Sequence, residues 1–160
     1  MTAKVLLLDQ LLSALSAERE AGKRIVFTNG CFDLMHIGHT RYLQAARELG
    51  DVLVVGVNSD ASVRSLDKAP DRPIVPEAQR AEVLAALGCV DYVIIFNESD
   101  PLRLITSVQP DILVKGGDWA IDRIVGRDIV EAGGGVVKTI PLVPGLSTTG
   151  FLERIRSAAK

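Results

Sequence analysis

The 160-residue sequence lacks several features that would assign it to a large class of proteins at once. It has no apolar run near the roughly 20 residues that a membrane-spanning helix needs, and the N-terminal MTAKVLLLDQLLSAL does not resemble a secretory signal peptide. Its formal net charge is −2, so no overall positive field attracts nucleic acid. Its two cysteines, Cys31 and Cys89, are far apart and are expected to be reduced thiols. These absences predict a cytoplasmic protein with no membrane or nucleic-acid partner.

The two best-known phosphate-binding loops are absent as well. No G-x-G-x-x-G follows the first predicted strand, and no G-x-x-x-x-G-K-[ST] occurs anywhere in the chain. These absences exclude the dinucleotide fingerprint and the P-loop. Any phosphate site must therefore be built from other residues.

Short β-branched runs alternate with helical patterns along the chain. Length and a hydrophobic content of 48% predict one domain over residues 1–160, with an N-terminal helix in 1–22 and a core in 23–160. Because most strands are apolar on both faces, they indicate an α/β fold, a doubly wound five-stranded parallel sheet with helices on both faces. The predicted strands are 24–29, 52–57, 92–96, 112–115 and 136–140. The predicted helices are 8–21, 38–49, 77–87, 101–108, 123–132 and 149–159.

Polar motifs follow the predicted strands, where ligands bind in a doubly wound sheet. TNG (28–30) follows the first strand, NSD (58–60) the second and KGGDW (115–119) the fourth, while PGLSTTG (144–150) precedes the last helix. A long irregular stretch, LDKAPDRPIVP (66–76), lies near the same edge, and loops of that length are often functional. We expect this stretch to close over bound phosphates as a lid.

Both histidines of the chain lie in TNGCFDLMHIGHTRYL, residues 28–43. His36 and His39 are three positions apart across a predicted helix start, so they can project to one side. A helix N-terminus offers N–H groups and a positive dipole to an anion. Imidazoles at that point can donate hydrogen bonds to phosphate oxygens, and more strongly as charge builds up in a transition state. The pair therefore favours a phosphate-binding site.

Two other interpretations of the histidines stay open. Both could be ordinary capping or surface residues. Alternatively, Cys31, Asp33, His36 and His39 could bind zinc, but no second Cys/His cluster supports this and the spacing matches no familiar zinc motif. The position of both histidines at the predicted ligand edge favours phosphate over either alternative, so no protein-bound metal site is expected.

The ordered set of motifs resembles a known family. His36-Ile37-Gly38-His39 is the HxGH motif of the nucleotidyltransferase superfamily, whose members share a Rossmann-like fold. The whole chain from Arg24 to Ile155 is similar to the cytidylyltransferase-like family, and most of all to its heptose-phosphate adenylyltransferases. The motifs are TNGCFDLMHIGHTRYL, GVNSDASVR, RPIVPEAQRAEVLAAL, VDYVIIF, PDILVKGGDW and STT. Many relatives are fused to a sugar kinase, and this chain resembles the stand-alone form.

The resemblance implies transfer of AMP from ATP to D-glycero-β-D-manno-heptose 1-phosphate, giving ADP-heptose, a precursor of lipopolysaccharide, and pyrophosphate. Mg²⁺ is expected with the ATP. The attacking phosphate is largely ionised at neutral pH, so the reaction needs no general base. It needs cations and N–H donors that hold two charged phosphates together. The partners implied are ATP and the sugar 1-phosphate, a second copy of the chain in a homodimer, and a separate sugar kinase of the same pathway.

The resemblance also implies roles for single residues. The catalytic residues would be His36, His39 and Lys68. The nucleotide would contact Thr28, Asn29, Gly30, Phe32, Asp33, Gly38, Lys115, Gly116, Asp118, Ser147, Thr148 and Thr149. The substrate phosphate would contact Arg72 and Arg80. Simpler roles exist for some of them: 147–149 can cap the last helix, 116–118 can form a tight turn, and Arg80 can be a solvated helix residue.

Two alternative functions stay open from the residues. The first is a polyol-phosphate cytidylyltransferase of the glycerol-3-phosphate type, which would use CTP; KGGDW and the N-terminal helix favour the heptose substrate. The second is a nucleotide-binding module without turnover, and the pair of histidines with the surrounding cations argues against it. Relatives usually carry a Lys-Gly pair where 66–70 reads LDKAP, so the sequence leaves open whether Lys68 or Arg72 is the loop contact.

Overall fold

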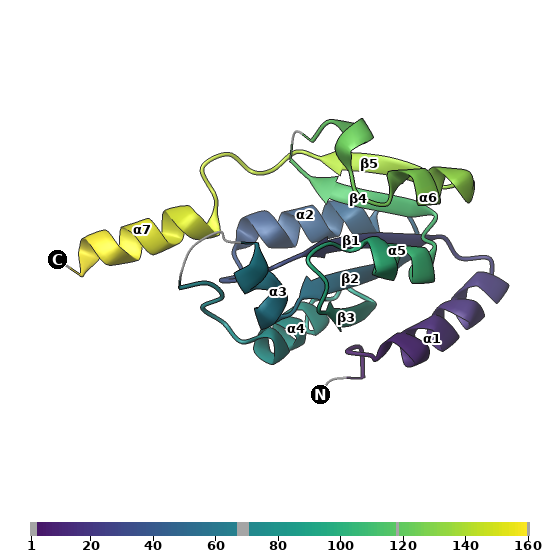
Figure 1. Ribbon diagram of the computed structural model, residues 1–160, viewed down its shortest axis with the longest axis horizontal. Helices are drawn as coiled ribbons and strands as arrows, with labels where there is room; N and C mark the ends of the chain where they lie inside the picture. The colour runs from purple at the N-terminus through teal and green to yellow at the C-terminus, as the bar shows by residue number, and fades with distance from the viewer. Residues whose placement is uncertain (1–2, 67–70, 118, 160) are drawn as a thin grey trace.

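Five parallel strands form one sheet in the order β3-β2-β1-β4-β5 (Figure 1). The computed structural model describes residues 3–66, 71–117 and 119–159. The strands are β1 (Ile25–Gly30), β2 (Val52–Asn58), β3 (Tyr92–Phe96), β4 (Ile112–Gly116) and β5 (Val136–Ile140). The prediction of a doubly wound sheet of five parallel strands is therefore confirmed.

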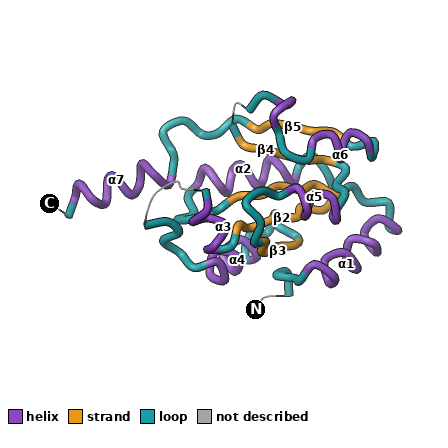
Figure 2. The backbone as a smooth tube through the Cα atoms, viewed as in Figure 1, coloured by secondary structure: helices purple, strands orange, loops and turns teal. Residues whose placement is uncertain are grey.

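Helices cover both faces of this sheet, also as predicted (Figure 2). They are α1 (Leu8–Glu20), α2 (Ile37–Arg47), α3 (Asp60–Ser65), α4 (Glu77–Ala85), α5 (Leu102–Val108), α6 (Arg127–Ala132) and α7 (Thr148–Ala158). Because side chains alternate along a strand, the sheet has two cores. Phe27 and Val54 pack in one core with α1, α5 and α6. Val26 and Val55 pack in the other with α2 and α4.

Two helical segments differ from the prediction. The helix expected over 123–132 is wrong in its first half: a 3₁₀ turn, Ile121–Arg123, precedes α6. Gly126 lies between them with φ 87°, a left-handed conformation that breaks a helix. Helix α3 was not predicted, because six residues are too few to show a helical period. It begins after Ser59, whose Oγ accepts a hydrogen bond from the Ser62 amide at 3.1 Å.

The switch point of the sheet lies between β1 and β4. From β1 the chain adds β2 and β3 on one side, then crosses to add β4 and β5 on the other. Because all strands are parallel, their carboxyl ends share one edge, and ligands bind in the crevice at such a switch point. Asn29 and Gly30 end β1, Asn58 ends β2, and Lys115 and Gly116 end β4. The predicted gathering of the strand-end motifs at this edge is confirmed.

Helix α7 leads away from the sheet in Figure 1, where it is yellow, and none of its residues is buried. Its first turn is nevertheless tied to the ligand edge, because Thr148 Oγ1 donates a hydrogen bond to the Asp33 carbonyl at 2.7 Å. In the part of the chain that the structure describes, no helix is long and apolar enough to cross a membrane. Of the irregular stretch 66–76, residues 66 and 71–76 are described, and none of them lies in a helix or strand.

Candidate active site

His36 and His39 lie together at the start of α2. His36 is the residue before the helix, and its Nδ1 accepts a hydrogen bond from the Gly38 amide at 3.1 Å. Nδ1 of His39 accepts one from the His36 amide at 3.3 Å. The two ring centroids are 4.0 Å apart. The histidines therefore cap the helix, as one interpretation allowed, and they also form the close pair that the phosphate interpretation requires.

These backbone contacts determine where each ring carries its proton. A nitrogen that accepts a hydrogen bond is unprotonated, so each neutral ring carries its proton on Nε2. Burial lowers the pKa of His36. Burial, with smaller effects from His36 and Arg72, lowers the pKa of His39 to about 4. At neutral pH both rings are therefore uncharged, with an Nε2–H donor on each.

Gly38 leaves the space that His36 occupies. A Cβ at position 38 would lie 2.8 Å from Nδ1 and Cε1 of the His36 ring, closer than real Cβ contacts come. The glycine of the HxGH motif is thus needed so that the first imidazole can fold back over the helix start and accept the Gly38 amide. A larger residue would displace the ring.

A cavity of about 200 Å³ opens beside the two imidazoles. Its other lining residues are Gly38, Tyr42, Leu142, Val143, Leu146, Ser147 and Thr148. Ser147 caps α7, since its Oγ accepts the Gly150 amide at 3.0 Å. The capping role considered for Ser147 is therefore confirmed, and the same residue still lines the cavity. Thr149 is exposed in the first turn of α7.

Two phenylalanines flank the histidines, Phe151 of α7 and Phe32. The Phe151 ring centroid lies 5.4 Å from that of His36, and the Phe32 centroid lies 5.6 Å from that of His39. Phe32 reaches this position with φ 49°, a left-handed conformation. The imidazole pair therefore has an aromatic ring on each side. Phe151 was not predicted as a site residue, because only the fold brings α7 to the start of α2.

The residues predicted at the end of β1 divide between the two faces of the sheet. Thr28 is fully buried and its Oγ1 lies 2.6 Å from the hydroxyl of Tyr42, whose pKa burial raises to about 12. The resemblance implied backbone contacts for Thr28, and its buried side chain leaves only the backbone for such a contact. Asn29 faces the other way, where its Oδ1 accepts a hydrogen bond from Lys115 Nζ at 3.3 Å. Gly30 ends the strand beneath the Phe32 ring.

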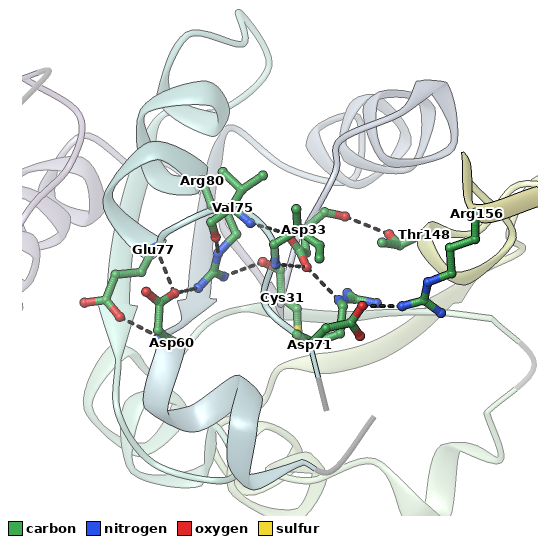
Figure 3. Close-up of polar contacts among 11 residues, drawn as sticks. Cys31, Asp33, Asp60, Asp71, Val75, Glu77, Arg80, Thr148 and Arg156 are labelled. Atoms are coloured by element: carbon green, nitrogen blue, oxygen red, sulfur yellow. Dashed lines mark hydrogen bonds and ion pairs between the residues drawn. The ribbon is translucent and has the colours of Figure 1, made fainter. Parts of the chain in front are cut away.

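Asp33 is the centre of a buried polar cluster (Figure 3). Its carboxylate accepts hydrogen bonds from Arg72 Nε at 2.6 Å and from the Ile74 and Val75 amides, each at 2.9 Å. Burial alone would raise its pKa, but these donors together lower it. Asp33 was predicted to contact the nucleotide. In the structure its carboxylate faces the protein and binds segment 72–75 to the turn before His36.

Arg80 is the largest fully buried side chain of the described residues. Its three nitrogens donate to the Val75 carbonyl at 2.8 Å, the Cys31 carbonyl at 2.5 Å and Asp60 Oδ1 at 2.7 Å (Figure 3). The alternative that Arg80 is a solvated helix residue is therefore wrong. At 1% exposure it also presents no surface to a substrate phosphate in this conformation. Asp60 was noted only as part of the strand-end motif NSD (58–60), and its pairing with Arg80 was not predicted.

Two predicted site residues, Lys68 and Asp118, lie outside the described residues. The lid prediction for 66–76 depends on Lys68 and stays a prediction. Arg72, the second loop contact considered, is 8% exposed and paired with Asp33. Lys115 and Gly116 lie at the end of β4. A Cβ at Gly116 would contact the side chains of Tyr42 and Leu142.

The donor atoms at this edge do not converge on a metal. Within 3–66, 71–117 and 119–159, no group of three or more His, Cys, Asp or Glu side chains could hold an ion. Both histidine Nδ1 atoms and the Asp33 carboxylate already accept protein hydrogen bonds. The described residues therefore give the zinc alternative no support, and a Mg²⁺ ion brought by ATP would take ligands from the phosphate oxygens.

A doubly wound sheet whose switch point carries a glycine-spaced histidine pair at a helix start defines a nucleotidyltransferase domain. A family model described as Cytidylyltransferase-like matches residues 27–153. The chain belongs to this family, and the resemblance drawn from HxGH and the later motifs is confirmed.

Individual relatives agree with this family. The chain is 56% identical over 157 residues to Bifunctional protein HldE of Geotalea uraniireducens, covering 98% of this chain and 32% of that protein. It is 56% identical over 153 residues to Bifunctional protein HldE of Syntrophotalea carbinolica, covering 96% of this chain and 31% of that protein. The chain thus spans about a third of the length of the curated relatives it matches.

Solved structures show the same fold. The lipopolysaccharide core biosynthesis protein from Thermoplasma volcanium is 33% identical, with a TM-score of 0.63 over 76% of this chain and 98% of that one. Pantothenate synthetase from Thermus thermophilus is 18% identical, with a TM-score of 0.59 over 88% of this chain and 62% of that one. The second likeness shows the fold alone.

Proposed function

We propose that this chain transfers AMP from ATP to D-glycero-β-D-manno-heptose 1-phosphate and releases pyrophosphate. An oxygen of the sugar phosphate forms a bond to the α-phosphorus of ATP, and the bond from that phosphorus to the bridging oxygen breaks. The bridging oxygen leaves with the electron pair as part of pyrophosphate, so no proton needs to be removed from the nucleophile.

The observation that carries the proposal is the pair of neutral imidazoles at the switch point. Their Nε2–H groups are donors fixed by backbone hydrogen bonds to Nδ1. Donors held in place before the reaction stabilise charge that develops on the α-phosphoryl oxygens and on the leaving group. His36 and His39 would therefore act as the catalytic donors, and no general base is required.

In this proposal the nucleotide would bind in the cavity beside the histidines. Its walls are apolar at Leu142, Val143 and Leu146, which suits a base or ribose face, and polar at Ser147 and Thr148. The amides at the start of α7 and of α2 provide further donors for phosphate. Mg²⁺ would arrive with ATP and neutralise the triphosphate.

Similarity favours ATP and a heptose phosphate over other substrates. Relatives at 56% identity are named Bifunctional protein HldE, and a 33% identical structure is named for lipopolysaccharide core biosynthesis. The resemblance of KGGDW and the neighbouring motifs points to the same reaction. We further propose, from the resemblance alone, a homodimer, a sugar kinase of the same pathway as a partner, a cytoplasmic location and one catalytic unit over residues 23–160.

A pyrophosphate-release assay with product mass tests the proposal. Purified protein is incubated with Mg²⁺ and either ATP or CTP, each with D-glycero-β-D-manno-heptose 1-phosphate or glycerol 3-phosphate. We expect pyrophosphate and a product of the mass of ADP-heptose only with ATP and the heptose phosphate. Turnover restricted to CTP and glycerol 3-phosphate would establish the polyol-phosphate alternative. ATP binding without pyrophosphate from either acceptor would indicate a non-catalytic module.

A further inference from the structure

Three neighbouring strands end in polar side chains on the same face of the sheet. Asn58 of β2, Asn29 of β1 and Lys115 of β4 each lie an even number of residues after a core residue of the same strand, and so share its face. Those core residues are Val52 and Val54 of β2, Phe27 of β1 and Leu113 of β4. All of those core residues pack against α1, α5 and α6. The three polar side chains therefore line the carboxyl edge on the face opposite α2, which carries the histidines.

A second cavity, of about 280 Å³, opens at these strand ends. The loop from β3 to α5 provides Ser99 and Asp100, and the segment after β4 provides Trp119 and Arg123. It shares no lining residue with the cavity beside the histidines. The two cavities therefore lie on opposite faces of the sheet, with the ends of β1 and β4 between them.

The chemistry of the two cavities differs. The histidine cavity combines N–H donors with apolar walls, but has no acidic side chain in its lining. The second cavity has the amides Asn29 and Asn58, the carboxylate of Asp100, and two cations, Lys115 and Arg123. A carboxylate repels a triphosphate but accepts hydrogen bonds from neutral hydroxyls, and paired amides can both donate and accept. The mixture suits a polyol that carries one phosphate.

Positions of the cations within the cavity suggest where that phosphate lies. Lys115 Nζ is held toward β1 by its hydrogen bond to Asn29 Oδ1 at 3.3 Å. Gly30, which also lines this cavity, is the last residue of β1 and leads into the turn that carries the histidines. A phosphate beside Lys115 and Gly30 would thus lie at the border between the two cavities. That border is where an acceptor phosphate must meet the α-phosphorus of ATP.

We propose that this second cavity binds the acceptor sugar 1-phosphate and selects its hydroxyls. Lys115 and Arg123 contact the phosphate, while Asp100 and Asn29 contact ring hydroxyls. Trp119, which is 56% exposed, covers the apolar face of the sugar ring. This inference rests on the proposed function, and it changes the predicted contact of Lys115 from nucleotide to acceptor phosphate.

Trp119 is the only tryptophan of the chain, so its fluorescence reports on this cavity directly. We expect D-glycero-β-D-manno-heptose 1-phosphate to change Trp119 emission in a saturable way, with or without a non-hydrolysable ATP analogue. The analogue alone should produce a much smaller change. Arg123→Ala should weaken the binding of the sugar phosphate about tenfold or more, the usual effect of losing a hydrogen bond to a charged group. No saturable change with the sugar phosphate, by fluorescence or by calorimetry, would overturn the inference.

Steady-state kinetics provide the second readout. Arg123→Ala and Asp100→Asn should raise KM for the heptose phosphate about tenfold and leave KM for ATP within about twofold. Asp100→Asn keeps an oxygen for the Leu102 amide, which Asp100 Oδ1 accepts at 2.9 Å, so the start of α5 is preserved. Arg127→Ala is the matched control, since Arg127 pairs with Glu131 and lines neither cavity. It should leave both KM values unchanged.

Failure of the inference and failure of the proposed function give different results. Wild-type turnover with a heptose KM that both variants leave unchanged would overturn the cavity assignment and keep the function. Saturable binding at Trp119 that Arg123→Ala weakens, without pyrophosphate release, would overturn the function and keep the cavity. Titration of wild type and of Asp100→Asn with D-mannose 1-phosphate then tests whether Asp100 binds ring hydroxyls. If both proteins bind this sugar phosphate with equal affinity, Asp100 does not have that role.

Discussion

Nε of Arg72 donates a hydrogen bond to Oδ2 of Asp33 at 2.6 Å, and both side chains are buried. Asp33 also accepts the amides of Ile74 and Val75, while its carbonyl accepts Thr148 Oγ1. One residue thus joins segment 72–75 and the first turn of α7 to the turn that precedes His36. The shape of the ligand edge depends on this buried pair.

Breaking the pair should destabilise the protein strongly. Asp33→Ala leaves a buried guanidinium unpaired and removes an acceptor from two amides, and loss of one partner of a buried pair costs about 3–5 kcal/mol. Urea unfolding of Asp33→Ala, Arg72→Ala and the double variant measures this. We expect the double variant to lose less stability than the sum of the two single variants. Strict additivity would mean that the two side chains do not act as a pair.

The histidines should be needed for turnover more than for folding. Removing one donor from a developing charge typically lowers the rate about 10²–10³-fold, so His36→Ala and His39→Ala should both fall in that range. His36→Asn separates two roles, because an asparagine oxygen can still accept the Gly38 amide while the Nε2–H donor is lost. Relative to His36→Ala, we expect His36→Asn to regain the roughly 1 kcal/mol of unfolding free energy that a lost N-cap costs. Its turnover rate should stay as low as that of His36→Ala. A rate within a few-fold of wild type in any of these variants would remove that residue from the catalytic donors.

The low pKa of His39 predicts how stability depends on pH. Its pKa is about 4 in the folded protein, below the ordinary value of about 6.5. The unfolded chain therefore takes up the proton first as the pH falls, so this contribution to stability is complete above pH 6.5 and is lost between about 6.5 and 4. Burial also lowers the pKa of His36, so His36 adds to the same loss of stability as the pH falls.

Urea titrations from pH 7 to 4.5 measure this dependence. The free energy of unfolding should fall less steeply in His39→Asn than in wild type, because only the wild type has the extra proton uptake on unfolding. Asparagine keeps an acceptor for the His36 amide. Identical slopes for the two proteins would show that His39 has an ordinary pKa. Bound ATP, being anionic, should raise the His39 pKa, which a proton NMR titration can follow.

The sheet and the histidine pair could be predicted because both depend on local sequence. Apolar runs and helical periods extend over a few neighbouring residues, and the two imidazoles are three positions apart. The polar cluster could not be predicted. Arg80 meets the carbonyl of Cys31, which is 49 positions away, and a helical arginine without visible partners resembles a solvated one. Its burial follows from the fold, which brings an acceptor to each of its nitrogens.

Helix α3 and the distribution of the site residues over two faces of the sheet could not be predicted either. Six residues after Ser59 contain no helical period, so only the hydrogen bond to the Ser62 amide marks the start. The sequence placed Asn29 and Lys115 at one edge correctly. It did not separate them from His36 and His39, because the face of a strand residue follows from its register with the core.

Gly38 should be irreplaceable for a steric reason. A methyl group at this position would meet the His36 ring at 2.8 Å, so Gly38→Ala must displace the imidazole or the helix start. Alanine is the better helix former by about 1 kcal/mol, so α2 itself should not be weakened. We expect Gly38→Ala to lower turnover nearly as much as His36→Ala while the free energy of unfolding changes little. Gly88→Ala is the control, since nothing lies within 4 Å of a Cβ there. Full activity in Gly38→Ala would show that the ring position is not critical.

Phe151 should hold His36 in place from α7. The two ring centroids are 5.4 Å apart, and Phe151 is the only residue of this helix with a ring contact to the histidines among the described residues. Phe151→Ala exposes the imidazole, so the His36 pKa, which burial lowers, should rise toward about 6.5. The less constrained donor should also reduce turnover and raise KM for ATP several-fold, more than any loss of stability explains. Leu152→Ala is the matched control, because Leu152 is half-buried on the same helix without that contact. NMR titration of His36 and steady-state kinetics give two independent readouts. If the His36 pKa and the kinetics of Phe151→Ala both match those of Leu152→Ala, α7 contributes only its first turn to the site.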